Sequence, residues 1–332
     1  MRSPALKELP PPPPGKIGWP WTEESPRLPD VMPDGTPWPK ISIITPSYNQ
    51  AVFIEETIRS VLLQGYPNLE YIIMDGGSSD GSVEIIKRYE NHLACWVSER
   101  DRGQTDAINK GFAAASGRIM AWINSDDLYT RNAFKRVIRR MWDHGKIIRP
   151  VVYGDCDVID TEGRFQKQWL SGPVTTDRLI TFWRKGHFVP QPTVFMADYT
   201  LRDLSLDVSL QYAMDWDLFL RLSRQYTFFH IPECLARFRI YAGTKSSEGD
   251  MRFQAEQLKI SQSYWKPGLQ SLQYGLEYHL SPLTGILRKA PWFMRGCLRK
   301  LLPEQGYDTL KHLKRRLLPR RNCRIREEDR YL

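Results

Sequence analysis

The chain has 332 residues, of which 41% are hydrophobic and 26% are charged, and its formal net charge at pH 7 is +9. This length predicts one large domain with appendages, or two domains, and the short apolar runs predict no membrane-spanning helix. Five scattered cysteines without a CxxC pair argue against a disulfide framework or a structural zinc site and favour a reducing cytoplasm. The N-terminal residues contain no apolar stretch, so we predict no secretory signal.

The first 39 residues are rich in proline, with a run of five at positions 10–14. Such a run forms only extended structure, so we predict an extended N-terminal segment over residues 1–39. Trp19, Trp21 and Trp38 are unusual in a free tail, and we expect them to pack back onto the rest of the protein.

From residue 40 onward, strand and helix patterns alternate four times. Strands are predicted over 41–47, 69–77, 94–99 and 118–124, and helices over 54–64, 81–90, 103–116 and 130–145. The alternation predicts an α/β fold, an αβα sandwich with a mostly parallel central sheet. Ligands of such sheets bind at the carboxyl ends of the strands, where this chain has TPSYN, MDGGSSDGS, SERDRG and NSDD.

After residue 150 the pattern predicts a hairpin (151–170), a strand (191–196), a helix (215–225), a second strand (234–241) and a last helix (249–265). We therefore divide the chain into the segment 1–39, a domain over 40–248 and a helical, basic C-terminal extension over 249–332.

Positive charge is concentrated in that extension. Residues 1–280 contain 33 Lys and Arg against 33 Asp and Glu, whereas residues 281–332 contain 14 against 5. Leucines at helical spacing predict basic amphipathic helices over 284–302 and 308–321. Such helices suit either an anionic membrane surface or docking on the body with solvated Lys and Arg outside, and no motif points to nucleic acid.

Four aspartates at three places in the chain carry the chemistry that we expect, and each place has a structural alternative. Asp75 ends a strand and could accept from a ribose hydroxyl or a base N–H, or simply form a tight turn. Asp126 and Asp127 form either an Asx turn or a site for Mg²⁺ or Mn²⁺, which prefer carboxylates together with substrate phosphates. Asp215 begins a helix, where it could complement the helix dipole or act as a general base. The dinucleotide fingerprint and the P-loop are both absent.

Taken in this order, the stretches ISIITPSYN, MDGGSSDGS, SERDRGQTDAINKG, NSDD and YAMDWDLFLRL resemble the family 2 glycosyltransferases with the GT-A fold, over about residues 40–245. The resemblance implies a nucleotide-sugar donor (a UDP-, GDP- or dTDP-sugar), a divalent metal and inversion at the anomeric carbon. It assigns the donor nucleotide to Thr45, Pro46, Tyr48, Asn49, Asp75, Asp106 and Asp126. It assigns the cation first to Asp127, with Asp126 beside it, and the catalytic base to Asp215.

One departure from the family pattern concerns the metal or phosphate site. Relatives often carry a His shortly after the last core strand, where this chain has Tyr241. Tyr241 and Lys245 are therefore candidates for contact with the diphosphate. The alternative for Lys245 is a solvated lysine in a loop. His187, Gln191 and Trp216 are candidates for contact with the acceptor, with ordinary packing as the alternative for His187 and Trp216.

The resemblance implies an inverting transfer of a sugar to a hydroxyl of a glycan or a lipid-linked saccharide, in the assembly of a cell-surface polysaccharide. We expect a cytoplasmic protein, either free or on the inner face of the membrane. A sugar-phosphate nucleotidyltransferase would need a Gly-rich first loop with a basic residue, and TPSYNQ has neither. A non-catalytic nucleotide-sugar-binding protein would not need Asp215.

Overall fold

The computed structural model describes residues 1–143, 145–184, 189–201, 205–242 and 250–289, without the side chains of 250 and 281–289. The chain divides into two compact units, Met1–Tyr264 and Trp265–Leu332, which we describe separately. The boundaries predicted at residues 39 and 248 stay predictions.

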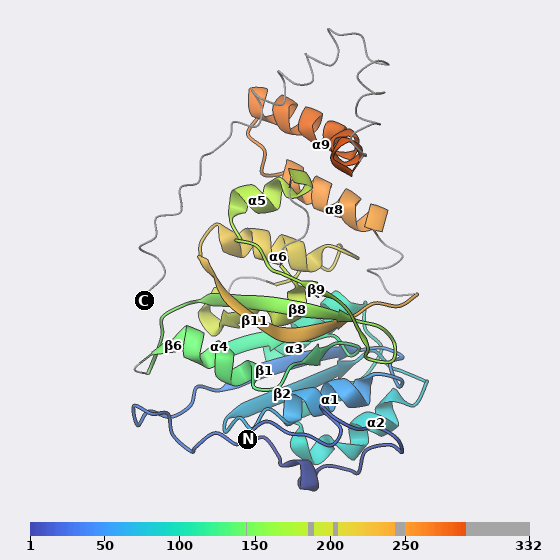
Figure 1. Cartoon of the computed structure of the whole chain (residues 1–332), viewed down its shortest axis with the longest axis vertical. Coiled ribbons are helices and arrows are strands. Elements are labelled where there is room, and N and C mark those ends of the chain that lie inside the picture. The colour runs from blue at the N-terminus through green and yellow to red at the C-terminus, as the bar shows by residue number, and fades with distance from the viewer. Residues whose placement is uncertain (144, 185–188, 202–204, 243–249, 290–332) are drawn as a thin grey trace. The chain divides into compact units, whose positions relative to one another are not determined.

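The first unit is built on a curled central sheet (Figure 1). Its strands are β1 (Ile41–Ser47), β2 (Leu69–Asp75), β3 (Cys95–Ser98), β4 (Ile119–Trp122), β5 (Leu128–Tyr129), β8 (Val151–Ile159), β9 (Phe165–Trp169), β10 (Phe195–Ala197) and β11 (Phe228–Arg239). They are ordered β3-β2-β1-β4-β10-β8-β11-β5, with β9 paired to β8. The strands β3, β2, β1, β4, β8 and β11 share one direction, whereas β10, β5 and β9 run against them, so the predicted mostly parallel sheet is confirmed. A separate hairpin pairs β6 (Trp142–Asp143) with β7 (Lys146–Ile147).

Helices pack on both faces of the sheet. They are α1 (Ile54–Leu62), α2 (Ser82–Arg88), α3 (Gln104–Ala114), α4 (Ala133–Met141), α5 (Thr176–Ile180), α6 (Met214–Ser223) and α8 (Asp250–Gln262). The side chains of β1 alternate between the faces: Ile41 and Ile43 join the core formed with α1, α2 and α4, whereas Ile44 meets α3. A Cβ at Gly111 would lie 2.4 Å from Ile44 Cγ2, so this glycine allows α3 to approach the sheet closely.

Three predicted elements differ from those observed. The helix predicted over 130–145 ends at Met141, and the next two residues enter the β6–β7 hairpin. The strand predicted over 191–196 is a 3₁₀ turn (Gln191–Thr193) followed by the short β10. The strand predicted from 234 begins at Phe228, because pairing with β8 continues across Pro232, which lacks an N–H, by a shift of register between Ile231 and Cys234.

The proline-rich N-terminal segment packs against the rest of the first unit, as its tryptophans predicted. Trp21 and Trp38 are buried, and the indole N–H of Trp19 donates to the carbonyl of Tyr129 at 2.9 Å. The buried Arg59 of α1 donates to the carbonyls of Pro10, Pro20 and Trp21.

In the second unit the structure describes residues 265–289, which contain the helix α9 (Leu269–Lys289). The predicted basic helix over 308–321, and the part of 284–302 that follows residue 289, lie outside the described residues. Within the residues described, no helix is long and apolar enough to cross a membrane.

Candidate functional site

The loops that follow β1 and β2 are joined into one rim at the carboxyl edge of the sheet. The backbone N–H of Asn49, which has a φ of 51°, donates to Ser78 Oγ at 2.8 Å, and the N–H of Ser79 donates to Asn49 Oδ1 at 3.0 Å. The N–H of Ala51 donates to Asp80 Oδ2 at 2.9 Å. These bonds hold Tyr48, which is 63% exposed, at the edge of the rim.

Asp75 is the carboxylate that orders this rim. Its Oδ2 accepts from the backbone N–H groups of Gly77 and Ser78 and from Ser98 Oγ, at 3.1, 2.9 and 2.7 Å. Its Oδ1 accepts from Ser78 Oγ at 2.6 Å, and the residue is only 3% exposed. The structure therefore places Asp75 beneath the predicted nucleotide site, with both oxygens already engaged by the protein.

The Asp126–Asp127 pair forms the turn after β4, and its two side chains face different surroundings. Asp127 is 1% exposed: its Oδ1 accepts from the backbone N–H of Arg239 at 2.9 Å, and its Oδ2 accepts from the amide of Asn124 at 3.3 Å. Asp126 is half-buried, and its Oδ2 accepts from the hydroxyl of Tyr241 at 3.1 Å. Asp126 thus faces the outside of the turn, while Asp127 faces into the protein.

Burial raises the pKa of both carboxyls, and the neighbouring charge of Asp126 raises the pKa of Asp127 further. The raised pKa values show that ionising both carboxyls is unfavourable here without a counter-charge. A hard cation would supply that counter-charge, and oxygen ligands suit Mg²⁺ or Mn²⁺. Among the described side chains, no group of three or more His, Cys, Asp or Glu could hold a metal. The pair fits a cation that takes its remaining ligands from substrate phosphates and water.

Arg239 connects this turn to the rest of the sheet. The residue is 1% exposed, and its guanidinium donates to the carbonyl of Asp126 at 2.9 Å and to Glu56 at 2.9 Å. It also donates to the carbonyls of Asp160 and Thr161, between β8 and β9. Sequence reasoning missed Arg239, although an arginine at the end of an apolar strand was a signal that could have pointed to it.

Tyr241 meets the acidic turn directly. Besides its bond to Asp126, its hydroxyl lies 3.5 Å from Gln50 Oε1, and its ring lies 5.0 Å from that of Phe53. Burial and the charge of Asp126 raise its pKa to about 12, so the phenol stays protonated and donates at neutral pH. The side chain that stands in place of the family histidine therefore contacts the predicted cation site.

Asp215 lies in the first turn of α6, where its Oδ1 accepts from the N–H of Trp216 at 2.7 Å. The loop before it is held by Glu256 of α8, which accepts from the backbone N–H groups of Gln211, Tyr212 and Ala213 at 3.0, 2.8 and 2.8 Å. Sequence reasoning missed Glu256, because nothing local links α8 to this loop.

The remaining predicted residues support the site from beneath or beside it. Thr45 is buried and shares a hydrogen bond with Tyr71, and Pro46 is buried as well. Gln191 donates to the carbonyl of Trp122 at the end of β4. Trp216 is 2% exposed and packs edge-on against Phe182, which is a core position.

Asp106 pairs with Arg102 and Lys110, and the guanidinium of Arg102 holds the pKa of Asp106 below its usual value. The predicted contacts His187 and Lys245 lie outside the described residues.

Comparisons with known proteins agree with this arrangement. Residues 42–201 match the family model described as glycosyl transferase family 2. The Rickettsia prowazekii protein RP339, an uncharacterized glycosyltransferase, is 26% identical over 246 residues, which cover 70% of this chain and 73% of RP339. TuaG of Bacillus subtilis, named as a teichuronic acid biosynthesis glycosyltransferase, is 37% identical over 112 residues, which cover 32% of this chain and 44% of TuaG.

Two solved structures share the fold. Residues 1–349 of S. aureus TarS, in complex with UDP-GlcNAc, match with a TM-score of 0.56 at 17% identity over 84% of this chain and 81% of that chain. The mannosyltransferase PcManGT from Pyrobaculum calidifontis, in complex with GDP-Man and Mn²⁺, matches with a TM-score of 0.52 at 20% identity over 87% of both chains.

Proposed function

We propose that this chain, which belongs to the family 2 glycosyltransferases through residues 42–201 and has the predicted GT-A fold, transfers a sugar from a nucleotide-diphosphate donor to an acceptor hydroxyl with inversion at the anomeric carbon. The observation that carries this proposal is the Asp126–Asp127 turn, which places two adjacent carboxyls, one of them half-buried and contacted by Tyr241, at the carboxyl end of β4. The complexes of the two structural relatives, with UDP-GlcNAc and with GDP-Man and Mn²⁺, support a nucleotide-sugar donor and a divalent cation.

We assign the cation to Asp126, although the family resemblance favours Asp127. Both oxygens of Asp127 accept hydrogen bonds inside the protein, whereas Asp126 is the more accessible of the two and is contacted by Tyr241. A bound Mg²⁺ or Mn²⁺ would stabilise the charge that develops on the departing diphosphate. Asp127 then keeps the turn in place, and the phenol of Tyr241 orients the carboxylate of Asp126.

Asp215 serves as the general base in this proposal. It takes the proton from the acceptor hydroxyl, whose oxygen forms a bond to the sugar C1 as the bond from C1 to the diphosphate oxygen breaks. The acceptor is proposed to be a glycan or a lipid-linked saccharide in polysaccharide assembly, which the name of TuaG supports. Binding of the basic extension to an anionic membrane surface stays a prediction.

A thermal-shift screen of UDP-, GDP- and dTDP-sugars with and without Mn²⁺ tests the proposal, followed by measurement of the nucleoside diphosphate released with a hydroxyl acceptor. We expect stabilisation by at least one donor only when Mn²⁺ is present. If no donor stabilises the protein under either condition, the proposed function is wrong.

Amide variants distinguish the proposed roles of Asp126 and Asp127. We expect Asp126→Asn to weaken Mn²⁺-dependent binding of UDP or GDP by at least about tenfold. Loss of a residue that only hydrogen-bonds to a metal ligand typically weakens metal binding by about that factor, and loss of a direct ligand should weaken it at least as much. We expect Asp127→Asn to lower the free energy of unfolding more than Asp126→Asn does, because both oxygens of Asp127 accept hydrogen bonds from the protein and an amide can accept at only one of the two positions. Titration calorimetry with and without Mn²⁺, and urea unfolding, measure the two effects. If nucleotide binding by Asp126→Asn depends on Mn²⁺ as fully as in the unaltered protein, the cation is bound by Asp127 instead of Asp126.

Glu256 gives a prediction about the position of the base. Glu256→Ala leaves three backbone N–H groups ahead of Asp215 without their acceptor, so we expect kcat to fall on the order of tenfold to hundredfold through misplacement of the base. Donor affinity should stay unchanged. Glu162→Ala, at an exposed turn, is the control, and an unaltered kcat in Glu256→Ala would contradict the assignment.

A further inference from the structure

At position 76, directly after β2, a side chain is excluded by a steric clash and not by the backbone conformation. The φ of Gly76 does not lie in the left-handed region, unlike that of Gly77, which is +82°. A Cβ built at Gly76 would lie 2.8 Å from Asp101 Oδ2, which is closer than real Cβ contacts. The carboxylate of Asp101 therefore occupies the place that a side chain at position 76 would take.

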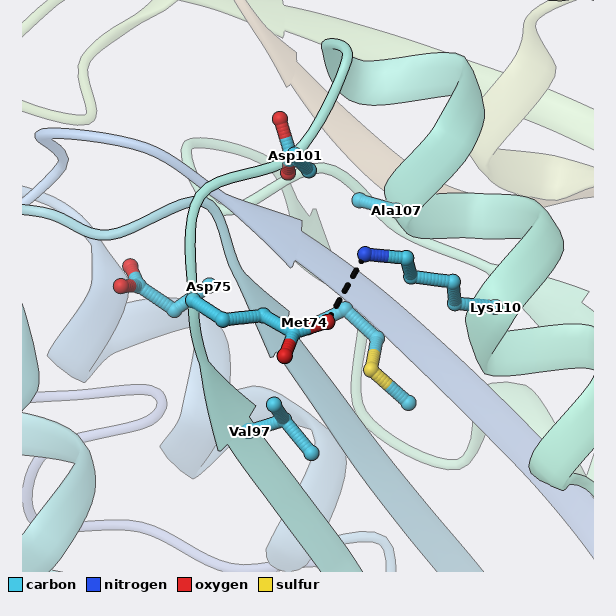
Figure 2. Close-up of a pocket in the computed structure, with 7 residues that line it drawn as sticks. Met74, Asp75, Val97, Asp101, Ala107 and Lys110 are labelled. Atoms are coloured by element: carbon cyan, nitrogen blue, oxygen red, sulfur yellow. Dashed lines mark hydrogen bonds and ion pairs between the residues drawn. The ribbon is translucent and has the colours of Figure 1, made fainter.

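Asp101 reaches this place from the loop after β3. Its Oδ1 accepts from the backbone N–H of Gly103 at 2.8 Å, which fixes the side chain, and no described residue donates to its Oδ2. Figure 2 shows Asp101 above a hollow whose lining includes Met74, Val97 and Ala107. The hollow, about 10 Å³, has room for one water molecule, so a larger ligand must lie across the rim above it.

The distance between Asp101 and the cation site indicates which part of a bound nucleotide donor Asp101 could contact. The cation site follows β4, and the sheet order β3-β2-β1-β4 puts the end of β3 three strands away, roughly 14 Å at the usual strand spacing. A group at that distance does not share the cation or the phosphates. It meets the opposite end of a nucleotide donor, which is the base.

The surroundings also suit a base. Tyr48, 63% exposed after β1, offers an aromatic face on which a base can stack. Asp75 already accepts four hydrogen bonds from its own loop and Ser98, whereas Asp101 Oδ2 accepts none from the described residues. A carboxylate only accepts hydrogen bonds, so it suits a base edge that presents a ring N–H.

We propose that Asp101 reads the base of the donor by accepting a hydrogen bond from the ring N–H of uracil, thymine or guanine, in the space that Gly76 leaves open. This inference rests on the proposed function and extends it to the class of base. Cytosine and adenine carry a bare ring nitrogen at the equivalent position, which would face the negative carboxylate, so nucleotides of these bases are disfavoured.

The test is titration calorimetry of UDP, GDP, CDP and ADP, each with Mn²⁺, on the full chain. The unaltered protein should bind UDP or GDP at least tenfold more tightly than CDP and ADP. Asp101→Asn should weaken binding of the preferred nucleotide by about tenfold to hundredfold, because a hydrogen bond to a charged group is lost. Binding of CDP and ADP should not weaken and should tighten, because the amide removes the negative charge that faces their ring nitrogen and can donate to it. Gly76→Ala should reduce the same preference by displacing the carboxylate.

Glu99→Gln is the matched control, because it removes a charge two residues away that is paired with Lys110 at 2.9 Å. It should keep the base preference, and circular dichroism should show that all variants fold. Binding of no nucleotide by the unaltered protein overturns the proposed function and this inference together. Two results overturn this inference alone. One is that Asp101→Asn binds UDP or GDP as tightly as the unaltered protein does, and the other is that the unaltered protein binds CDP as tightly as UDP or GDP.

Discussion

We expect Asp215→Asn to lower turnover by roughly 10²- to 10⁴-fold, the usual contribution of a general base, while donor affinity stays as it is. The amide keeps the size of the side chain and its acceptor for the N–H of Trp216, so the start of α6 is retained. It cannot take the proton from the acceptor hydroxyl. Steady-state release of nucleoside diphosphate measures turnover, and calorimetry with donor and Mn²⁺ measures affinity.

Asp217→Asn is the matched control on the same helix turn. Asp217 pairs with Arg221 at 2.8 Å, so its loss affects a salt bridge of α6 and not the base. Normal turnover in Asp215→Asn would remove Asp215 from the mechanism. A protein that binds donors but never releases product, with or without this change, would instead be a non-catalytic nucleotide-sugar-binding protein.

Arg239→Met should lower the free energy of unfolding by about 3–5 kcal/mol, the range found when one partner of a buried ion pair is removed. The change leaves the half-buried Glu56 without its cation and three backbone carbonyls without their donor. Because one of these carbonyls belongs to Asp126, Mn²⁺-dependent nucleotide binding should weaken as well. Guanidinium unfolding and calorimetry measure the two losses.

Two further variants show whether the loss belongs to the guanidinium network. Arg239→Lys keeps the charge but has no planar fork, so it should retain only part of the stability. Arg237→Met, two residues earlier on β11 and partly exposed, should have a small effect. Equal stability of Arg239→Met and Arg237→Met would show that the network does not hold the acidic turn.

The sequence by itself determined the order of elements around the site. The alternation of strand and helix from residue 40 to 141, and the polar loops at the strand ends, follow from side-chain periodicity and turn residues, which act over a few positions. The family resemblance and the mostly parallel sheet followed from the same local patterns. Strand-end position was enough to bring Asp75 and the Asp126–Asp127 pair to one edge of the sheet.

Only the tertiary structure decided what each carboxylate can do. Asp75, Asp126 and Asp127 look alike in sequence, yet Ser98 and the rim saturate Asp75, Arg239 engages Asp127, and Tyr241 meets Asp126. The same holds for Asp101, which matters because Gly76, at the end of the neighbouring strand β2, leaves space for its carboxylate. Burial and hydrogen-bond partners set the accessibility and the pKa of a carboxyl, and they come from distant segments that no local pattern reveals.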